Sequence, residues 1–200
     1  MPEPHVPHVG ADGWVSGTRR HPSPNIDARP AGMPIDLIVL HNISLPPARS
    51  AADFGTDAVL DFFTNALDCD AHPYFDQLRG VRVSAHFFIR RTGECVQFAS
   101  CDARAWHAGA SDFFGRTRCN DFSVGIEIEG TDHLPFTHEQ YAATASLVRA
   151  ICAAYPITAI AGHSDIAPGR KTDPGPHFDW AHLRALGGFH AALFPYQHAR

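Results

Sequence analysis

Apolar and branched residues gather in short continuous runs at two places in the chain. The first run, IDLIVLHN, begins at Ile35, and the second, ITAIAGH, begins at Ile157. Runs of this length that stay apolar without alternation are typical of strands buried on both faces of a sheet. Both runs end in a histidine, His41 and His163, and polar residues follow at once. The pattern therefore predicts two buried strands that each carry an imidazole at their end.

Other segments predict further strands. SAHFFIRRTGECVQF reads as two strands joined at Thr92 and Gly93, which is the pattern of a β-hairpin. In SVGIEIEG, apolar residues alternate with glycine and glutamate, so Glu127 and Glu129 share one face of a strand. The sheet is thus expected to present two carboxylates on the same side.

Helical spacing appears in segments that lie between the predicted strands. TDAVLDFFTNAL, residues 56–67, has apolar residues at helical spacing after a possible cap. THEQYAATASLVRAICAAY opens with a capping box from Thr137 to Gln140 and carries an apolar stripe. FDWAHLRALGGF predicts a last short helix that Gly187 and Gly188 stop. Strands and helices alternate, which predicts one α/β domain built around a single sheet.

The first part of the chain differs from the rest. Residues 1–34 are rich in proline, glycine and histidine and show neither strand nor helix periodicity, so we expect an irregular N-terminal arm. The remaining predicted elements form one domain over residues 35–195, and 200 residues are enough for a single core.

Composition narrows the classes of function. The formal net charge is −5, with 16 Lys and Arg against 21 Asp and Glu, so no basic face for nucleic acid is expected. The start, MPEPHVPHVG, lacks the features of a secretory signal, and no run has the length of a membrane span. Five cysteines without a C-x-x-C spacing indicate reduced thiols. We therefore expect a cytoplasmic protein with no membrane contact and no evident obligate protein partner.

GHSDIAPGRKTDPGP, residues 162–176, concentrates charge among glycines and prolines that exclude a long helix or a central strand. Taken alone, this stretch is more often a solvated turn than a site. If the two buried strands are neighbours, however, His41 and His163 emerge at one edge and could each give a nitrogen to a divalent metal. Asp165 and Asp173 are both candidates for a third ligand, and spacing alone leaves the choice between them open.

The chain also contains longer motifs. They are VLHNISLPP (39–47), RVSAHFFIRRTGECVQ (82–97), RAWHAG (104–109), CNDFSVGIEIEGTD (119–132) and GHSDIAPGRKTDPGPHFDW (162–180). With these motifs the chain closely resembles the cytoplasmic anhydro-N-acetylmuramyl-L-alanine amidases, the AmpD family, from about Trp14 to about Leu186. The resemblance implies the fold of the zinc amidases and peptidoglycan recognition proteins, a single α/β domain with a central mixed sheet flanked by helices.

The resemblance also implies which residues carry the chemistry. His41, His163 and Asp173 match the ligands of one zinc ion per chain, which leaves Asp165 as a loop former. Glu127 and Lys171 match the family's catalytic pair. These residue types suit the reaction, because a carboxylate can take the proton of a zinc-activated water and a fixed cation can stabilise the oxyanion of the tetrahedral intermediate.

Substrate contacts follow from the same resemblance. Arg82 and Arg118 match family positions that contact acidic groups of the muropeptide, and guanidinium groups suit carboxylates. Asn42, Trp106 and His107 are expected to line the binding groove, although each could instead serve packing.

The implied function is zinc-dependent hydrolysis of the amide between the lactyl group of (anhydro-)N-acetylmuramic acid and L-alanine. The substrate would be a small soluble muropeptide from cell-wall turnover, met in the cytoplasm during peptidoglycan recycling. One alternative is a muropeptide-binding module of the same fold that does not cleave, whose mark would be a lost metal ligand. Another is a zinc peptidase that cuts a different bond in cell-wall peptides.

Overall fold

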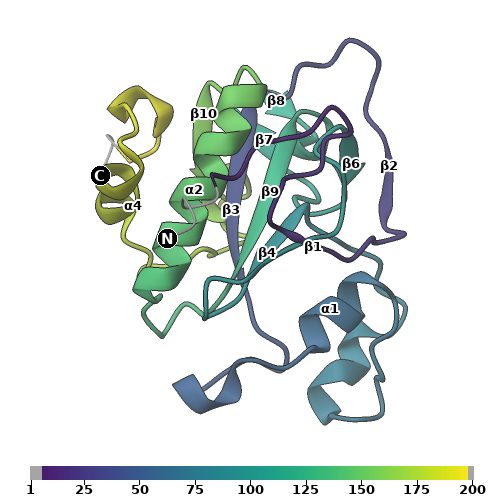
Figure 1. Ribbon diagram of the computed structural model, residues 1–200. Helices are drawn as coiled ribbons and strands as arrows, with labels where there is room; N and C mark the ends of the chain where they lie inside the picture. Colours follow the sequence, from purple (N-terminus) through teal and green to yellow (C-terminus); the bar gives the residue numbers. More distant parts are fainter. Residues whose placement is uncertain (1–5, 198–200) are drawn as a thin grey trace.

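The computed structural model describes residues 6–197 and is built around a six-stranded sheet with the order β1-β5-β4-β9-β3-β10 (Figure 1). β4 and β5 pair in antiparallel fashion, and the other neighbouring strands of this sheet are parallel. The expected central mixed sheet is therefore confirmed. Its strands are β1 (Arg19–Arg20), β3 (Leu37–Ile43), β4 (Phe87–Ile89), β5 (Cys95–Gln97), β9 (Ser123–Glu129) and β10 (Ala159–Gly162).

Two small antiparallel pairs and several helices surround this sheet. The pairs are β2 (Ile26–Ala28) with β6 (Ala103–Ala105), and β7 (Asp112–Phe113) with β8 (Arg116–Thr117). The α-helices are α1 (Ala58–Phe63), α2 (His138–Ala154), α3 (His163–Ile166) and α4 (Trp180–Gly187). Short 3-10 helices lie at η1 (Ala51–Asp53), η2 (Pro73–Leu78), η3 (Cys119–Asp121) and η4 (Ala191–Leu193).

The two faces of the sheet are covered differently. α2 and α4 cover one face, where Leu40 and Ile126 pack in the same cluster as Val148 of α2. α1 lies apart from these helices, below β4 and β1 in Figure 1, and its side chains pack with Phe88 and Phe98. Because strand side chains alternate, His41 points to the face opposite Leu40. His41 of β3 and Glu127 of β9 therefore point away from α2.

Most predicted helices and strands are confirmed, and the structure shows the pairing and capping contacts on which they depend. β3 and β10 are neighbouring parallel strands, with Leu40 opposite Gly162. The capping box of α2 is formed, because the Thr137 hydroxyl accepts from the Gln140 N–H and the Gln140 side chain accepts from the Thr137 N–H. α4 ends at Gly188, whose φ of 66° lies in the left-handed region.

The helix predicted over residues 56–67 is shorter than expected. α1 covers only Ala58–Phe63, and Asn65 adopts a φ of 63°. A left-handed residue cannot continue a right-handed helix, and asparagine tolerates this conformation better than most residues. The apolar spacing was correct, but it could not show where the backbone turns.

The arm over residues 1–34 was predicted to be irregular, and two short segments correct this. β1 pairs with β5 at the edge of the main sheet, and β2 pairs with β6. Strands of two or three residues carry too little periodicity to be recognised, since their pairing depends on distant partners. The Arg29 guanidinium holds the arm by donating to the Cys101, Asn120 and Ser123 carbonyls at 2.8–3.0 Å. Residues 1–5 lie outside the described part of the chain.

Membrane spans were searched for among the helices of residues 6–197, and none of those helices combines the length and the apolar character that crossing a bilayer requires.

Candidate metal centre and active site

Two buried imidazoles meet where β10 ends beside β3. His41 and His163 follow the paired residues Leu40 and Gly162, so both lie at the same edge of the sheet, although β3 continues past its predicted end at His41 to Ile43. Their Nδ1 atoms lie 2.9 Å apart, and the two residues are only 1% and 3% exposed. The neighbouring strands inferred from the apolar runs therefore do bring the two histidines together.

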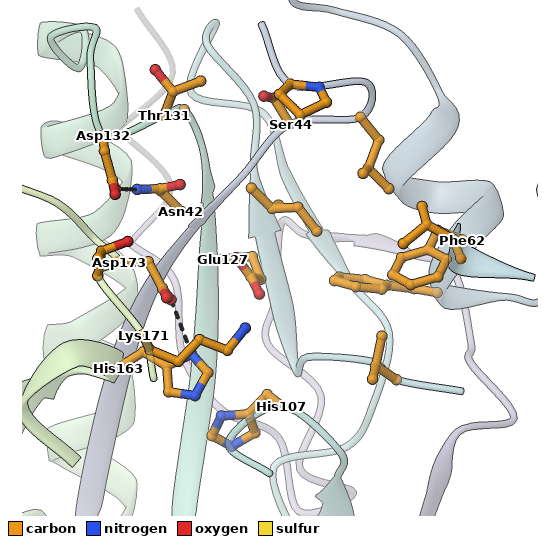
Figure 2. A pocket seen from close by; sticks show the side chains of 18 of the residues that line it. Asn42, Ser44, Phe62, His107, Glu127, Thr131, Asp132, His163, Lys171 and Asp173 are labelled. Carbon is orange, nitrogen blue, oxygen red and sulfur yellow. Dashed lines mark hydrogen bonds and ion pairs between the residues drawn. The ribbon is translucent and has the colours of Figure 1, made fainter. Parts of the chain in front are cut away.

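Asp173 completes a group of three donor atoms. The loop after α3 folds back, because the Ser164 N–H donates to the Asp173 carbonyl at 2.9 Å. Asp173 Oδ2 lies 3.0 Å from Nδ1 of each histidine, and Figure 2 shows its contact with His163. Asp165, the other candidate, uses its carboxylate to accept from the Gly162 N–H at 2.8 Å. Among residues 6–197, His41, His163 and Asp173 form the one cluster of histidine, cysteine and acidic side chains suited to a metal.

The three donors fit a catalytic zinc site. Two imidazole nitrogens and one carboxylate oxygen are ligands that zinc accepts, with a fourth position left for water. Zinc bonds of about 2.0–2.2 Å at tetrahedral angles place ligand atoms about 3.3 Å apart or slightly more. The observed triangle, with sides of 2.9–3.0 Å, is only slightly tighter. The geometry thus suits a metal ion that is coordinated by three protein ligands.

The hydrogen bonding of His163 gives a second argument for a cation. Its Nε2 lies 3.1 Å from the Ala108 carbonyl oxygen, which can only accept, and 3.4 Å from Arg170 Nη2, which already donates to that carbonyl; the shorter contact places the proton on Nε2. In a neutral imidazole, Nδ1 then presents a lone pair to the carboxylate of Asp173. Lone pairs that converge this closely repel one another unless a proton or a metal ion lies between them. A bound metal ion would supply the positive charge.

Burial sets the charges of the cluster. Burial lowers the pKa of His41 to about 4, and the neighbouring His163 acts in the same direction. Burial alone would raise the pKa of Asp173, but the two adjacent imidazoles outweigh it and hold that pKa below its usual range. Neutral imidazoles and an ionised carboxylate are the forms that bind a metal.

Glu127 lies beside this cluster on β9. β3 and β9 pair so that His41 is directly opposite Glu127, and Glu127 Oε1 is 4.0 Å from His41 Nδ1. Burial, followed by the charge of Asp173, raises the pKa of Glu127 well above its usual value, and Lys171 opposes this shift. Its Oε2 has no hydrogen-bond partner within residues 6–197. A buried carboxyl group with a free oxygen suits proton transfer.

Glu129 shares the face of Glu127 but has a different environment. Its Oε1 accepts from the Gly55 N–H at 2.7 Å, and its Oε2 accepts from the Arg91 N–H at 2.8 Å. Both oxygens therefore hold the loops that lead into α1 and follow β4. Of the two glutamates on this face, Glu127 is the one with an oxygen free to act on a ligand.

Lys171 approaches from the loop that carries Asp173. Its backbone N–H donates to the Ala167 carbonyl at 3.0 Å, which fixes the start of the loop. Figure 2 shows its side chain passing over His163, with the ammonium group directed into the cavity toward the side of Glu127. The cation can therefore meet negative charge that develops above the cluster.

A cavity of about 640 Å³ opens above these residues (Figure 2). This volume suits a small ligand such as a short peptide joined to one sugar. One side is polar and is lined by Asn42, Thr131, Asp132, His133, Lys171 and Thr172. The other side is apolar and is lined by Leu45, Pro47, Phe62, Phe63, Tyr74, Leu78, Val81 and Val83.

The residues expected to contact substrate fall into two groups. Asn42, Trp106 and His107 line the cavity. Arg82 is exposed and donates to the adjacent Val81 carbonyl at 3.5 Å, outside the cavity lining. Arg118 likewise lies outside the lining, with its side chain 70% exposed and paired with Asp121 at 3.2 Å. The roles of both arginines in substrate binding stay predictions.

Sequence reasoning missed two parts of the cavity wall. Asp132 accepts from the Asn42 side chain at 2.7 Å, next to the metal cluster. The apolar side comes from Phe62 of α1 and Tyr74 of η2, among others. The helical spacing around Phe62 was visible in the sequence. The surface that this helix would cover was not visible, because its contact with the cavity joins segments far apart in the chain.

Comparison with known proteins agrees with this geometry. The sequence pattern of the N-acetylmuramoyl-L-alanine amidase family matches residues 31–176. The chain is 53% identical over 176 residues to the 1,6-anhydro-N-acetylmuramyl-L-alanine amidase AmpD of Escherichia coli strain K12, covering 87% of this chain and 94% of that protein.

Solved structures share the fold. A crystal structure of a selenomethionine derivative of AmpD superposes with a TM-score of 0.84 at 52% identity, covering 88% of this chain and 97% of that one. The amidase AmiD of Escherichia coli, in complex with anhydro-N-acetylmuramic acid-L-Ala-D-γ-Glu-L-Lys, gives 0.56 at 29% identity and covers 92% and 66%. The Drosophila peptidoglycan recognition protein PGRP-LB, at 18% identity, gives 0.55 and covers 87% and 92%, which shows the fold alone.

Proposed function

This chain belongs to the N-acetylmuramoyl-L-alanine amidase family, and we propose that it hydrolyses the amide between the lactyl group of anhydro-N-acetylmuramic acid and L-alanine. The substrates are muropeptides released in cell-wall turnover, so the reaction belongs to peptidoglycan recycling. The observation that carries this conclusion is the likeness to AmpD over most of both chains. The site agrees with it, since a three-donor cluster lies beside a buried glutamate.

His41, His163 and Asp173 would hold one zinc ion per chain. When bound, zinc supplies Lewis-acid activation of a water molecule. The support for zinc is the donor set, the near-equilateral triangle of donor atoms and the converging lone pairs described above.

Glu127 would act as the general base and then as the general acid. Its carboxylate takes the proton from the attacking water and returns it to the amide nitrogen, which leaves as the amino group of the peptide. The raised pKa of Glu127 suits a group that must hold the proton between these two steps. Lys171 would stabilise the negative oxygen of the tetrahedral intermediate, because its ammonium group points into the same cavity (Figure 2).

The cavity suits a small soluble substrate with two kinds of surface. The polar side that contains Asn42 and Asp132 can bind peptide amides and sugar hydroxyls. The apolar side can pack against the methyl groups and the carbon skeleton of the sugar. Arg82 and Arg118 would hold carboxylates of the peptide beyond the cavity, as the family resemblance implies. The cytoplasm, where imported turnover fragments occur, is the proposed place of action.

Product analysis by mass spectrometry tests the proposal. The zinc-loaded protein, incubated with anhydro-muramyl tripeptide, should release the free tripeptide and the anhydro sugar. The same assay with the ordinary muramyl tripeptide measures the preference for the anhydro form. Cleavage within the peptide alone would instead indicate a zinc peptidase. Binding without cleavage, with metal content verified, would indicate a recognition module.

A further inference from the structure

Both ligand imidazoles are held from behind by one dipeptide, His107–Ala108. The Ala108 carbonyl accepts from His163 Nε2 at 3.1 Å, and His107 Nδ1 lies 3.0 Å from Nε2 of His41. The dipeptide itself is fixed by Asn120, whose Oδ1 accepts from the backbone N–H of His107 at 3.1 Å and of Ala108 at 2.7 Å. One segment thus orients two ligands that come from different strands.

His41, His107, Ser123 and the Cys119 carbonyl form a series of hydrogen bonds, and the carbonyl at its end fixes the direction of each bond. Ser123 Oγ lies 2.6 Å from the Cys119 carbonyl oxygen, which only accepts, so the Ser123 hydroxyl donates its proton there. Ser123 Oγ must then accept from His107 Nε2, 3.1 Å away. A neutral His107 consequently has a lone pair on Nδ1, which accepts from His41 Nε2. The remaining nitrogen of His41, Nδ1, is left as a lone pair aimed at the metal cluster.

The packing around His107 supports the same role. A Cβ atom placed on Gly125 would lie 2.4 Å from His107 Cγ, so only glycine leaves room for this ring against β9. Both ring nitrogens of His107 are engaged within the protein, and neither is free for a substrate. His107, which was expected to line the binding groove, can therefore offer the substrate only the face of its ring.

We propose that His107 is a positioning residue which, supported by Ser123, fixes the ring orientation and the Nε2–H tautomer of His41 and so prepares Nδ1 to bind the metal. This inference rests on the proposed zinc site. Groups that orient a ligand histidine in this way are typically worth 10- to 100-fold in metal affinity.

Zinc dissociation constants, measured by competition with a chromophoric chelator, test the proposal. His107→Leu removes the acceptor and should weaken zinc binding by about 10- to 100-fold. His107→Asn places an amide oxygen near the position of Nδ1 and should recover most of the loss. Ser123→Ala keeps both imidazoles but removes the group that orients His107, so it should also weaken binding.

His86 provides the matched control. It is a fully buried imidazole whose ring centroid lies 5.7 Å from that of His107, but its hydrogen-bond partners are Gly125, Ala103 and Arg29, none of which is a proposed metal ligand. His86→Leu should leave the zinc dissociation constant within about threefold of the parent, a change well below that expected for a ligand-orienting residue. Circular dichroism and thermal melting verify that each variant is folded.

The outcomes separate this inference from the proposed function. A parent protein that binds no zinc would overturn the metal site itself. A parent that binds zinc, with a folded His107→Leu that binds it equally well, would overturn the role of His107 alone. The same holds if His107→Asn is no better than His107→Leu, or if His86→Leu weakens zinc as much. If His107→Leu does not fold, a folded Ser123→Ala that binds zinc as tightly as the parent would overturn the role.

Discussion

His41 and Glu127 lie directly opposite each other on the neighbouring parallel strands β3 and β9, with Oε1 of the glutamate 4.0 Å from Nδ1 of the histidine. Strand register therefore sets the distance between a metal ligand and the proposed general base. A slip of one residue would turn Glu127 to the opposite face, toward α2. The buried apolar residues of both strands, such as Leu40 and Ile126, oppose such a slip.

Glu127→Gln should abolish turnover while zinc stays bound. The amide keeps the shape of the side chain but cannot accept the proton of the attacking water, and loss of a general base costs about 10²- to 10⁴-fold in rate. Steady-state kinetics and metal analysis of the same sample measure both effects. Glu129→Gln is the matched control, because Glu129 holds two backbone N–H groups. It should lower the melting temperature and leave turnover within a few-fold. Near-parental turnover in Glu127→Gln would refute the proposed base.

Asp173→Ala should remove zinc and activity together. The parent should carry one zinc ion per chain, lose activity with a chelator and regain it when zinc is added, since the site needs all three donors. Asp165→Asn tests the neighbouring aspartate, which caps the Gly162 N–H instead of joining the cluster. It should keep its zinc. The assignment would be contradicted by activity that survives verified metal removal, or by zinc lost from the Asp165 variant alone.

The contrast between Asp165 and Asp173 shows where sequence reasoning stops. The two histidines could be placed from sequence, because continuous apolar runs indicate buried strands. The third ligand could not be chosen by spacing, and only the family resemblance pointed to Asp173, because this residue reaches the cluster only when its loop folds back onto Ser164 and Gly162. A Cβ on Gly162 would lie 2.8 Å from Pro174 Cδ, so that close approach depends on a glycine eleven residues before the ligand.

The position of His107 had no local signal either. Its partners His41 and Ser123 are 66 and 16 residues away in the chain. RAWHAG is too short, and its polar and apolar residues follow no clear period, so the sequence could not predict where the His107 imidazole points. Elements stabilised by their own pattern, such as α2 with its capping box, were predictable. Features that arise only from tertiary contacts, such as the β1 pairing, were not.

Lys171→Met should lower kcat much more than it raises KM, because an oxyanion donor acts mainly in the transition state. Lys171→Arg keeps the charge in a different shape and should recover part of the rate. Lys171 is also the only lysine of the sequence. Reductive methylation therefore has one side-chain target, and it should leave the rate largely intact because the charge is retained. An effect of Lys171→Met confined to KM would count against the proposed role.

The metal-free protein should lose stability as the pH falls from about 6.5 toward 5. Burial lowers the pKa of His41 to about 4 and that of His86 to about 3, whereas an unfolded imidazole titrates near 6.5. The raised pKa of Glu127 acts in the opposite direction, but His41, His86 and His107 outnumber it, so below pH 6.5 the unfolded chain binds more protons than the folded one. The free energy of unfolding should therefore fall, by up to about 1.4 kcal/mol per pH unit for each such imidazole.

Urea denaturation of chelator-treated protein at pH 7.5, 6 and 5 measures this slope. His86→Gln should reduce it, because it removes an imidazole that is neutral when folded and charged when unfolded. His177→Gln changes an exposed imidazole and should leave the slope as it is. The loss of stability for His41 should level off near pH 4, where its folded form also takes up a proton. A free energy of unfolding that stays constant between pH 7.5 and 5 would show that these imidazoles are not held neutral by burial.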